Sequence, residues 1–391
     1  MKHNCSSYVN SMIGVKMKKL TKLLLIEMCV LSIVFLLGCS NNKNIKDDIL
    51  EENSSTLESH SNSEGANDNS EKLDNDKKVD VWLAYWDTLD FEEEIDYWSE
   101  RISNIVYFAA YFNENNELFV PDDINDTKEI VDELYGSEGW GNYISFVNDK
   151  VYSDGKSSLK DTELLYELFK SNESIDNHVN EIINTAVEGG YEGIEIDYEK
   201  IRKDLGLWDK FTVFLEKLIE AADSYNLPIR VLLEPSTPVD KINLPEGPEY
   251  IMMCYNLYGY GTKPGPKADK AFLLELVDKM KKVSSNRGYA LATGGFDFAD
   301  NGQIKAITKQ EAEEILADYN GTNMNSEAVV DNEITVTRDE DSKCNVFKYT
   351  DDNGINHEVW YADNVTLDYW EGILSEAGEK NISIWKLGET R

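Results

Sequence analysis

From residue 80 onward, short apolar runs alternate with longer segments in which apolar residues recur every three or four positions. The short runs have the length of buried strands, and the longer segments have the period of amphipathic helices. The strands are predicted at Val81–Trp86, Ile105–Phe112, Tyr143–Val147, Gly193–Tyr198, Ile229–Glu234, Tyr250–Tyr255, Tyr289–Phe296 and Ile382–Leu387. The clearest helical patterns are at Phe91–Ile102, Ile175–Val187, Trp208–Ala222 and Lys270–Val283.

This alternation is typical of a parallel sheet covered by helices. Eight strands with helices between them fit a (β/α)₈ TIM barrel, in which each strand is followed by an outer helix. A doubly wound open sheet would give the same alternation, so the pattern by itself leaves both folds open. We expect a barrel at residues 79–391, with a small α+β insertion after the seventh strand.

The insertion is expected at about residues 299–363, where the alternation is interrupted. Residues 308–311 (Thr-Lys-Gln-Glu) have the sequence of a capping box at the start of a helix. Residues 351–354 (Asp-Asp-Asn-Gly) are typical of a hairpin turn, here between strands predicted at Asn345–Thr350 and Ile355–Tyr361. A helix and a hairpin at this point would form a wall beside the barrel mouth. The alternative is a surface decoration without a role in the site.

The first residues of the chain have the pattern of an export signal. A basic segment at residues 17–22 precedes the apolar run Leu23–Leu37, which is short for a membrane span and is interrupted by a glutamate. The run ends in Leu-Leu-Gly-Cys, which resembles the bacterial lipoprotein box. That resemblance implies that residues 1–38 are removed and that Cys39 is lipidated, which places the protein on the extracellular face of the bacterial cell membrane. An ordinary signal peptide or a signal anchor is the alternative.

Residues 39–78 are rich in Asn, Ser, Asp, Glu and Lys and contain no aromatic residue. Such a segment cannot bury enough apolar surface to fold, so we expect a disordered tether. The formal net charge of −36 repels nucleic acid, which excludes it as an expected partner. The chain has no Cys-x-x-Cys pair, so a zinc site is not expected. We expect a monomer that contacts the membrane through its lipid.

The most informative stretch is Tyr191–Glu199. Side chains alternate along a strand, so Glu195, Asp197 and Glu199 share one face. On an exposed antiparallel strand this would be ordinary amphipathicity. A strand between two helices is buried on both faces, however, so the three carboxylates would point into the barrel. Burying unpaired charge is expensive, and such a series is therefore expected to share protons or to perform chemistry. Barrel active sites lie at the carboxyl ends of the strands, where Glu199 is placed.

The same stretch resembles the signature of glycoside hydrolase family 18, the chitinase-like family, whose pattern is Asp-Gly-x-Asp-x-Asp-x-Glu. Gly193, Asp197 and Glu199 match it identically. Glu192 and Glu195 replace two aspartates, and the longer side chain at Glu195 is expected to change the inner proton-sharing pair.

Further segments agree with the family in order and position. Residues 253–256 (Met-Cys-Tyr-Asn) resemble its Met-x-Tyr-Asp, which implies that Tyr255 bonds the substrate acetamide and that Asn256 contacts the sugar. Trp385 matches the tryptophan under the cleaved sugar, and Tyr85 is a further candidate sugar contact. The family's Ser-x-Gly-Gly is missing, and residues 145–148 (Ser-Phe-Val-Asn) stand in its place.

The resemblance implies a reaction in which the substrate's own 2-acetamido group attacks the anomeric carbon. Glu199 would be the acid and base, Asp197 would accept the acetamide N–H, and Glu195 would contribute to substrate binding. The substrate would be an N-acetylated glycan, with no metal or organic cofactor. Within the insertion, residues 306–308 (Ala-Ile-Thr), 347–349 (Phe-Lys-Tyr) and 357–361 (His-Glu-Val-Trp-Tyr) resemble the insertion of bacterial cell-wall and spore-cortex N-acetylglucosaminidases. The sequence leaves peptidoglycan and chitin both open.

Two non-enzymatic functions compete with this interpretation. A catalytically weak or inactive barrel could bind glycans at the cell surface, although retention of Asp197 and Glu199 favours an enzyme. A lipoprotein of this size could also be the solute-binding subunit of a transporter. That function requires a two-lobed open sheet and gives no reason for the carboxylates.

Overall fold

The computed structural model describes residues 78–87, 95, 98–320 and 334–388. The predicted signal peptide, Cys39 and nearly all of the predicted tether lie outside these residues. None of the described helices is long and apolar enough to cross a membrane. The fold below is that of the unit formed by residues 75–391.

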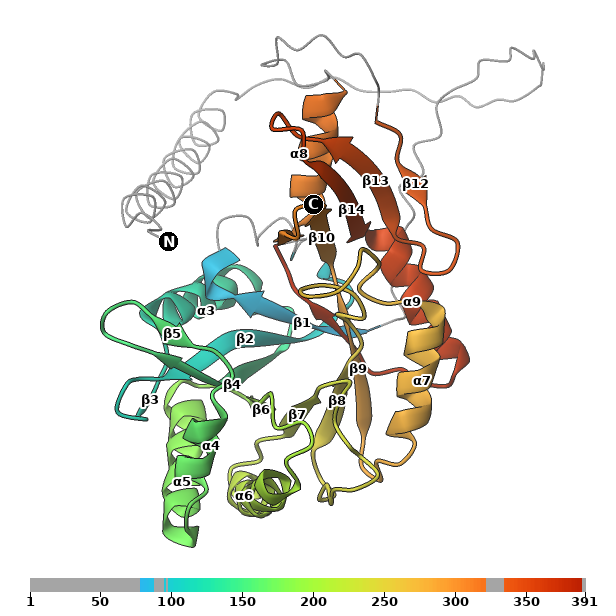
Figure 1. Ribbon diagram of the computed structural model, residues 1–391. Helices are drawn as coiled ribbons and strands as arrows, with labels where there is room; N and C mark the ends of the chain where they lie inside the picture. Colours follow the sequence, from blue (N-terminus) through green and yellow to red (C-terminus); the bar gives the residue numbers. More distant parts are fainter. Residues whose placement is uncertain (1–77, 88–94, 96–97, 321–333, 389–391) are drawn as a thin grey trace, which may run out of the picture. The chain divides into compact units, whose positions relative to one another are not determined.

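Parallel strands form a closed barrel (Figure 1). In chain order they are β1 (Val79–Ala84), β2 (Ile102–Phe112), β4 (Gly141–Val151), β6 (Gly193–Asp197), β7 (Ile229–Leu233), β8 (Glu249–Met253), β9 (Arg287–Ala292) and β15 (Ile382–Trp385). They pair in the order β2-β1-β15-β9-β8-β7-β6-β4, and β4 pairs back onto β2. This closure excludes the doubly wound alternative, whose open sheet has two edges. The predicted (β/α)₈ barrel is confirmed.

Helices lie in most of the connections between successive barrel strands: α3 (Asp122–Tyr135), α4 (Thr162–Leu168), α5 (Asn172–Glu188), α6 (Leu205–Asp223), α7 (Lys270–Met280) and α9 (Asn364–Glu376). The connection between β7 and β8, residues 234–248, has no helix, unlike the expected repeat of one outer helix after each strand. In α6, the side chain of Asp204 caps the first turn, and Phe211, Leu215 and Leu218 recur on the buried face. The helical patterns predicted in the regions of α5, α6 and α7 are confirmed. Half of the residues of the helix predicted at Phe91–Ile102 lie outside the described residues, and its last residue already belongs to β2.

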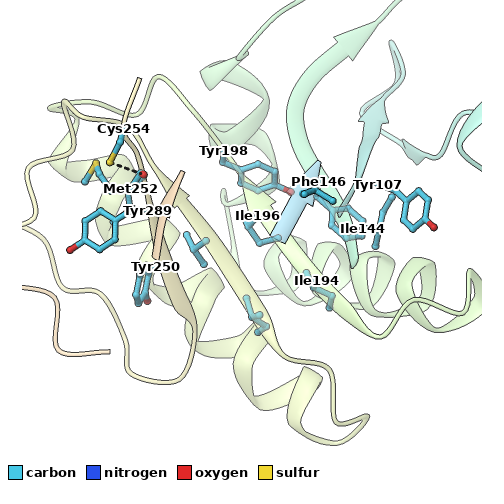
Figure 2. Packing of buried hydrophobic residues seen from close by; sticks show 14 of the residues in the cluster. Tyr107, Ile144, Phe146, Ile194, Ile196, Tyr198, Tyr250, Met252, Cys254 and Tyr289 are labelled. Atoms are coloured by element: carbon cyan, nitrogen blue, oxygen red, sulfur yellow. Dashed lines mark hydrogen bonds between the residues drawn. The ribbon is translucent and has the colours of Figure 1, made fainter. Parts of the chain in front are cut away.

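Each barrel strand is buried on both faces, and the two faces have different partners. Apolar residues on the outer face pack under the helices, as Figure 2 shows for Ile194 and Ile196 of β6 beside Ile144 and Phe146 of β4. A separate apolar cluster comprises Trp82, Val106, Phe108, Ala109, Tyr111, Val147, Leu232, Ile251, Met253 and Ala290. The strand period of two assigns this cluster to the barrel interior.

The insertion after the seventh strand is a second sheet with one helix (Figure 1). Its strands are β10 (Gly294–Ala299), β11 (Ile304–Ile307), β12 (Thr337–Arg338), β13 (Asn345–Thr350) and β14 (Asn356–Ala362), and its helix is α8 (Lys309–Tyr319). The predicted capping box at Thr308 and the predicted hairpin of β13 and β14 are both confirmed.

The insertion begins earlier than expected. The strand predicted at Tyr289–Phe296 is two strands, because β9 ends at Ala292 and β10 begins at Gly294. At Gly295 a Cβ atom would lie 1.8 Å from the carbonyl oxygen of Trp360, so β10 can pass close to β14 only with glycine there. Since β10 continues from the carboxyl end of β9, the second sheet starts at the end of the barrel where Glu199 lies.

Candidate active site

The centre of the candidate site is β6, whose residues are all buried. Ile194 and Ile196 face the helices, and the alternation directs Glu195 and Asp197 to the barrel interior. Gly193 is required by packing, since a Cβ atom there would lie 2.1 Å from the Tyr143 ring. The strand ends at Asp197, one residue before the predicted end at Tyr198. Glu199 therefore lies in the loop just beyond the strand, at the carboxyl end where the sequence had placed it.

Asn148, at the carboxyl end of β4, holds the backbone of Glu199. Its side-chain oxygen accepts the N–H of Glu199 at 2.9 Å, and its amide donates to the Glu199 carbonyl at 3.2 Å. Asn148 is only 1% exposed, so these bonds are sheltered from water. The asparagine that departs from the family pattern therefore fixes the loop that carries the predicted acid.

An ion pair that the sequence did not reveal joins Lys160 to Glu199. Lys160 lies between the short strand β5 (Ser157–Ser158) and α4. Its ammonium group contacts Oε2 of Glu199, whose side chain is 14% exposed. The two residues lie 39 positions apart in the chain, and no motif connects them.

Burial is the largest influence on the pKa values of the two predicted catalytic carboxyls. It raises the pKa of Asp197 well above its usual value, and the nearby Glu199 charge adds to the increase. Burial also raises the pKa of Glu199, while Lys160 opposes this effect. One oxygen of Asp197 (Oδ1) is buried and has no hydrogen-bond partner within the described residues. An aspartate placed in this way favours the neutral acid or a substrate N–H donor at that oxygen.

Glu195 has partners that the sequence did not reveal. It accepts the indole N–H of Trp82 at 2.6 Å and lies 3.1 Å from Nε of Arg230. Its charge also raises the pKa of the neighbouring Asp197, and the expected proton sharing between the two stays a prediction. Arg230 also pairs with Asp80. Burial raises the pKa of Glu195, and Arg230 opposes this increase. Glu195 is 0% exposed, and the predicted contact with the sugar stays a prediction.

Aromatic side chains surround the carboxyls. The half-buried Trp385 ring packs edge-on against Trp82 and Phe108, with centroid distances of 5.9 and 4.8 Å. Burial raises the pKa of Tyr255 well above its usual value, and the charges of Asp197 and Glu199 add to this. The Tyr255 phenol therefore stays protonated, and it lies close enough to the two carboxyls for electrostatic interaction with them.

The other predicted contacts are less enclosed. Tyr85 follows β1 directly and packs edge-on against Tyr111, with a centroid distance of 6.3 Å. Asn256 is exposed and has a left-handed backbone, with φ of 62°. Two neighbours of the carboxyls were missed from the sequence, Tyr111 and Asp149. Asp149 follows Asn148 on β4, and the unusual run Asn-Asp at a barrel strand end was the available signal.

A cavity of about 730 Å³ lies elsewhere, at the amino ends of the barrel strands. Asp80, Arg230 and Glu249, each near the start of its strand, contribute to its lining. The carboxyls of Asp197 and Glu199 are at the opposite ends of the strands, so this cavity is separate from the candidate site. Within the described residues, no group of three or more His, Cys, Asp or Glu side chains could hold a metal ion.

Comparison with solved structures identifies the architecture. The spore cortex-lytic enzyme SleL of Bacillus cereus matches with a TM-score of 0.63 at 17% identity, over 80% of this chain and 71% of that one. A chitinase from Chromobacterium violaceum gives 0.64 at 14% identity, over 81% and 95% of the two chains. This chain has the chitinase-like barrel fold. A class V chitinase from Pseudomonas fluorescens agrees, with 0.65 at 16% identity over 81% and 96%.

The curated sequence relatives match a smaller part of this chain than the solved structures do. No protein-family model matches the chain. YdhD of Bacillus subtilis strain 168, by name a sporulation-specific glycosylase, is 25% identical over 246 residues, which are 58% of this chain and 54% of YdhD. The cortical fragment-lytic enzyme of the same organism is 25% identical over 238 residues, 54% of this chain and 49% of that enzyme. The chain thus spans about half the length of the curated relatives it matches.

Proposed function

We propose that this protein is a retaining glycoside hydrolase of the chitinase-like type that cleaves β-linked N-acetylglucosamine-containing glycans. The observation that carries the proposal is the pair of carboxyls at the carboxyl end of β6, the buried Asp197 and the partly buried Glu199, both with raised pKa values. Burial favours the protonated form that a general acid needs near neutral pH. The names of the relatives, a glycosylase and a cortical fragment-lytic enzyme, support the same activity.

In the proposed reaction, Glu199 protonates the glycosidic oxygen and later accepts a proton from water. Asp197 accepts the N–H of the 2-acetamido group through its unpartnered oxygen and so directs the acetamide carbonyl to the anomeric carbon. The phenol of Tyr255 donates a hydrogen bond to the same acetamide. The half-buried ring of Trp385 provides an apolar platform for the sugar.

The substrate assignment follows from this chemistry. An acetamide that acts as the nucleophile must be present at C2 of the cleaved sugar, so peptidoglycan and chitin-like oligosaccharides are both candidate substrates. We propose peptidoglycan at the cell surface, because both curated relatives have names from sporulation or the spore cortex. The proposed lipid at Cys39 would hold the enzyme on the extracellular face of the membrane, where it would act as a monomer.

The reaction is tested by identifying its products. Purified peptidoglycan and chitin oligosaccharides are digested, and the fragments are identified by mass spectrometry. Proton NMR of fresh product from a β-linked substrate is expected to show the β anomer first. An α anomer appearing first, or equal cleavage of substrates that lack the N-acetyl group, would refute the mechanism.

A binding protein is the second candidate, and the ion pair between Lys160 and Glu199 favours it, since a paired carboxylate is a poor acid. A chromogenic N-acetylglucosaminide separates the two functions. Turnover that is lost in Glu199→Gln supports the enzyme, whereas glycan binding without turnover in the wild type supports the binding protein.

A further inference from the structure

We propose that Lys160 is a positioning residue, whose ammonium group holds the Glu199 carboxylate in the free enzyme and must release it before Glu199 can act as an acid. This inference rests on the proposed function. Lys160 contacts the Glu199 carboxylate, and in the proposed mechanism it contacts neither the glycosidic oxygen nor the anomeric carbon, so it acts only through Glu199. Its effect is therefore expected in the pH dependence of the reaction more than in substrate binding.

The backbone around Lys160 is built for this contact. Lys160 has a left-handed backbone, with φ of 56°, which is unfavourable for a residue with a side chain. Its N–H donates to the Asp149 carboxylate at 2.6 Å, and the next N–H, of Asp161, donates to the carbonyl of Asn148 at 2.8 Å. The ammonium group of Lys200 donates to the carbonyl of Leu159 at 3.0 Å on the other side. A lysine on an unrestrained surface loop would need none of these bonds.

The same strand end holds both members of the pair. The Asn148 side chain bonds the backbone of Glu199 and also donates to the carbonyl of Asp161 at 3.3 Å, next to Lys160. Both partners are therefore fixed relative to β4. Pairing in the free enzyme therefore has to order the two side chains but not the backbone that carries them.

Lys160 is the positive charge that opposes the effect of the surrounding carboxylates on the pKa of Glu199. The charged groups that act on the two carboxyls are Asp149 of β4, Glu195 of β6, Glu234 after β7 and Lys160, besides the two carboxyls themselves. The phenols of Tyr111 on β2 and Tyr255 after β8 lie close enough for these carboxyls to raise their pKa values. Burial and the neighbouring carboxylates raise the pKa of Glu199, and Lys160 lowers it. Removing the ammonium group should thus leave Glu199 protonated up to a higher pH.

The test compares the pH profile of kcat/KM in wild type, Lys160→Met and Lys160→Arg. Lys160→Met should move the alkaline limb upward by about one pH unit, because an adjacent opposite charge changes a carboxyl pKa by about one to three units and Lys160 is partly exposed. Lys160→Arg should retain most of the wild-type limb. Lys156→Met is the matched control, since Lys156 lies nearby in the chain and pairs with the exposed Asp154. It should leave the profile unchanged.

A second measurement does not depend on activity. Glutamate labelled with ¹³C at the carboxyl is titrated by NMR in the full chain, and the Glu199 signal is assigned by its loss in Glu199→Gln. An upward shift of the Glu199 midpoint in Lys160→Met, together with the shifted activity limb, supports the proposal. An unchanged midpoint overturns it. A shifted midpoint in a protein that cleaves no N-acetylated glycan supports the pairing and refutes the proposed function instead.

Discussion

Replacing Arg230 with methionine tests how much the buried ion pairs of Arg230 with Asp80 and Glu195 contribute to the stability of the barrel. Arg230 is buried, pairs with Asp80 and Glu195, and donates to the Ser383 hydroxyl at 3.0 Å. Methionine keeps the aliphatic part of the side chain but removes the guanidinium, whose Cζ lies 5.3 Å from the centroid of the Trp82 ring. It therefore leaves two carboxylates without their cation. Removing one partner of a buried pair typically costs about 3–5 kcal/mol. At roughly 2 °C per kcal/mol for a large domain, Tm should fall by on the order of 10 °C.

The loss should depend on pH. Burial raises the pKa of Glu195, and Arg230 is the chief group that opposes this, so the pKa of Glu195 rises further in Arg230→Met. A carboxyl whose folded pKa exceeds its unfolded pKa stabilises the fold below the unfolded value, and this contribution is lost as pH rises through the folded value. The difference in unfolding free energy between variant and wild type should therefore shrink at acidic pH. Urea denaturation followed by circular dichroism at several pH values measures it.

A double variant separates lost charge pairing from lost packing. Arg230→Met with Glu195→Gln removes one unpaired carboxylate and keeps an acceptor for the Trp82 indole, so it should recover at least about 1 kcal/mol. Lys217→Met, which breaks a surface pair with Asp176, should change stability by less than about 1 kcal/mol. A stability loss in Arg230→Met that is the same at every pH, and is not reduced in the double variant, would refute the electrostatic explanation.

Other substitutions address the proposed chemistry and the chain's attachment. Glu199→Gln keeps the side-chain shape but cannot transfer a proton, so kcat should fall by about 10²–10⁴-fold in a chromogenic assay while the circular dichroism spectrum is unchanged. Asp197→Ala should lower kcat more than it raises KM, since the acetamide must be oriented chiefly as the ring forms; steady-state kinetics in which only KM changed would contradict the role of Asp197. Cys39→Ser should abolish incorporation of labelled fatty acid, and equal labelling of both proteins would exclude lipidation at Cys39.

The sequence was most informative where the chain's own period determines the geometry. Alternation along β6 correctly directed Ile194 and Ile196 to the helices, because a strand between helices has only two faces. The helix caps and the hairpin of the insertion are likewise local and were predicted at the right residues. Such features depend on neighbours within a few positions.

Contacts between strands were not predictable in the same way. The register of β6 and β7 places Glu195 beside Arg230, and barrel closure brings β1, with Asp80, to the same arginine. An arginine within the apolar run Ile229–Leu233 was a visible signal of a buried partner, but it did not identify Glu195. Lys160 gave no comparable signal, because its contact depends on how a loop is anchored to β4.

The pairing of Gly294 with Ala362 has a consequence for redesigning the molecule. The chain leaves the barrel at Gly294 and returns to it at Ala362, and these two residues are paired in an antiparallel ladder. Residues 294–362 therefore connect to the barrel as a loop whose two ends are adjacent. The entropy of closing a loop changes slowly with its length, by about 0.6 kcal/mol for each doubling. A short turn, or a different folded segment with neighbouring termini, could therefore be spliced between β9 and α9 at little thermodynamic penalty to the barrel. The segment at the mouth of this barrel is exchangeable as a module.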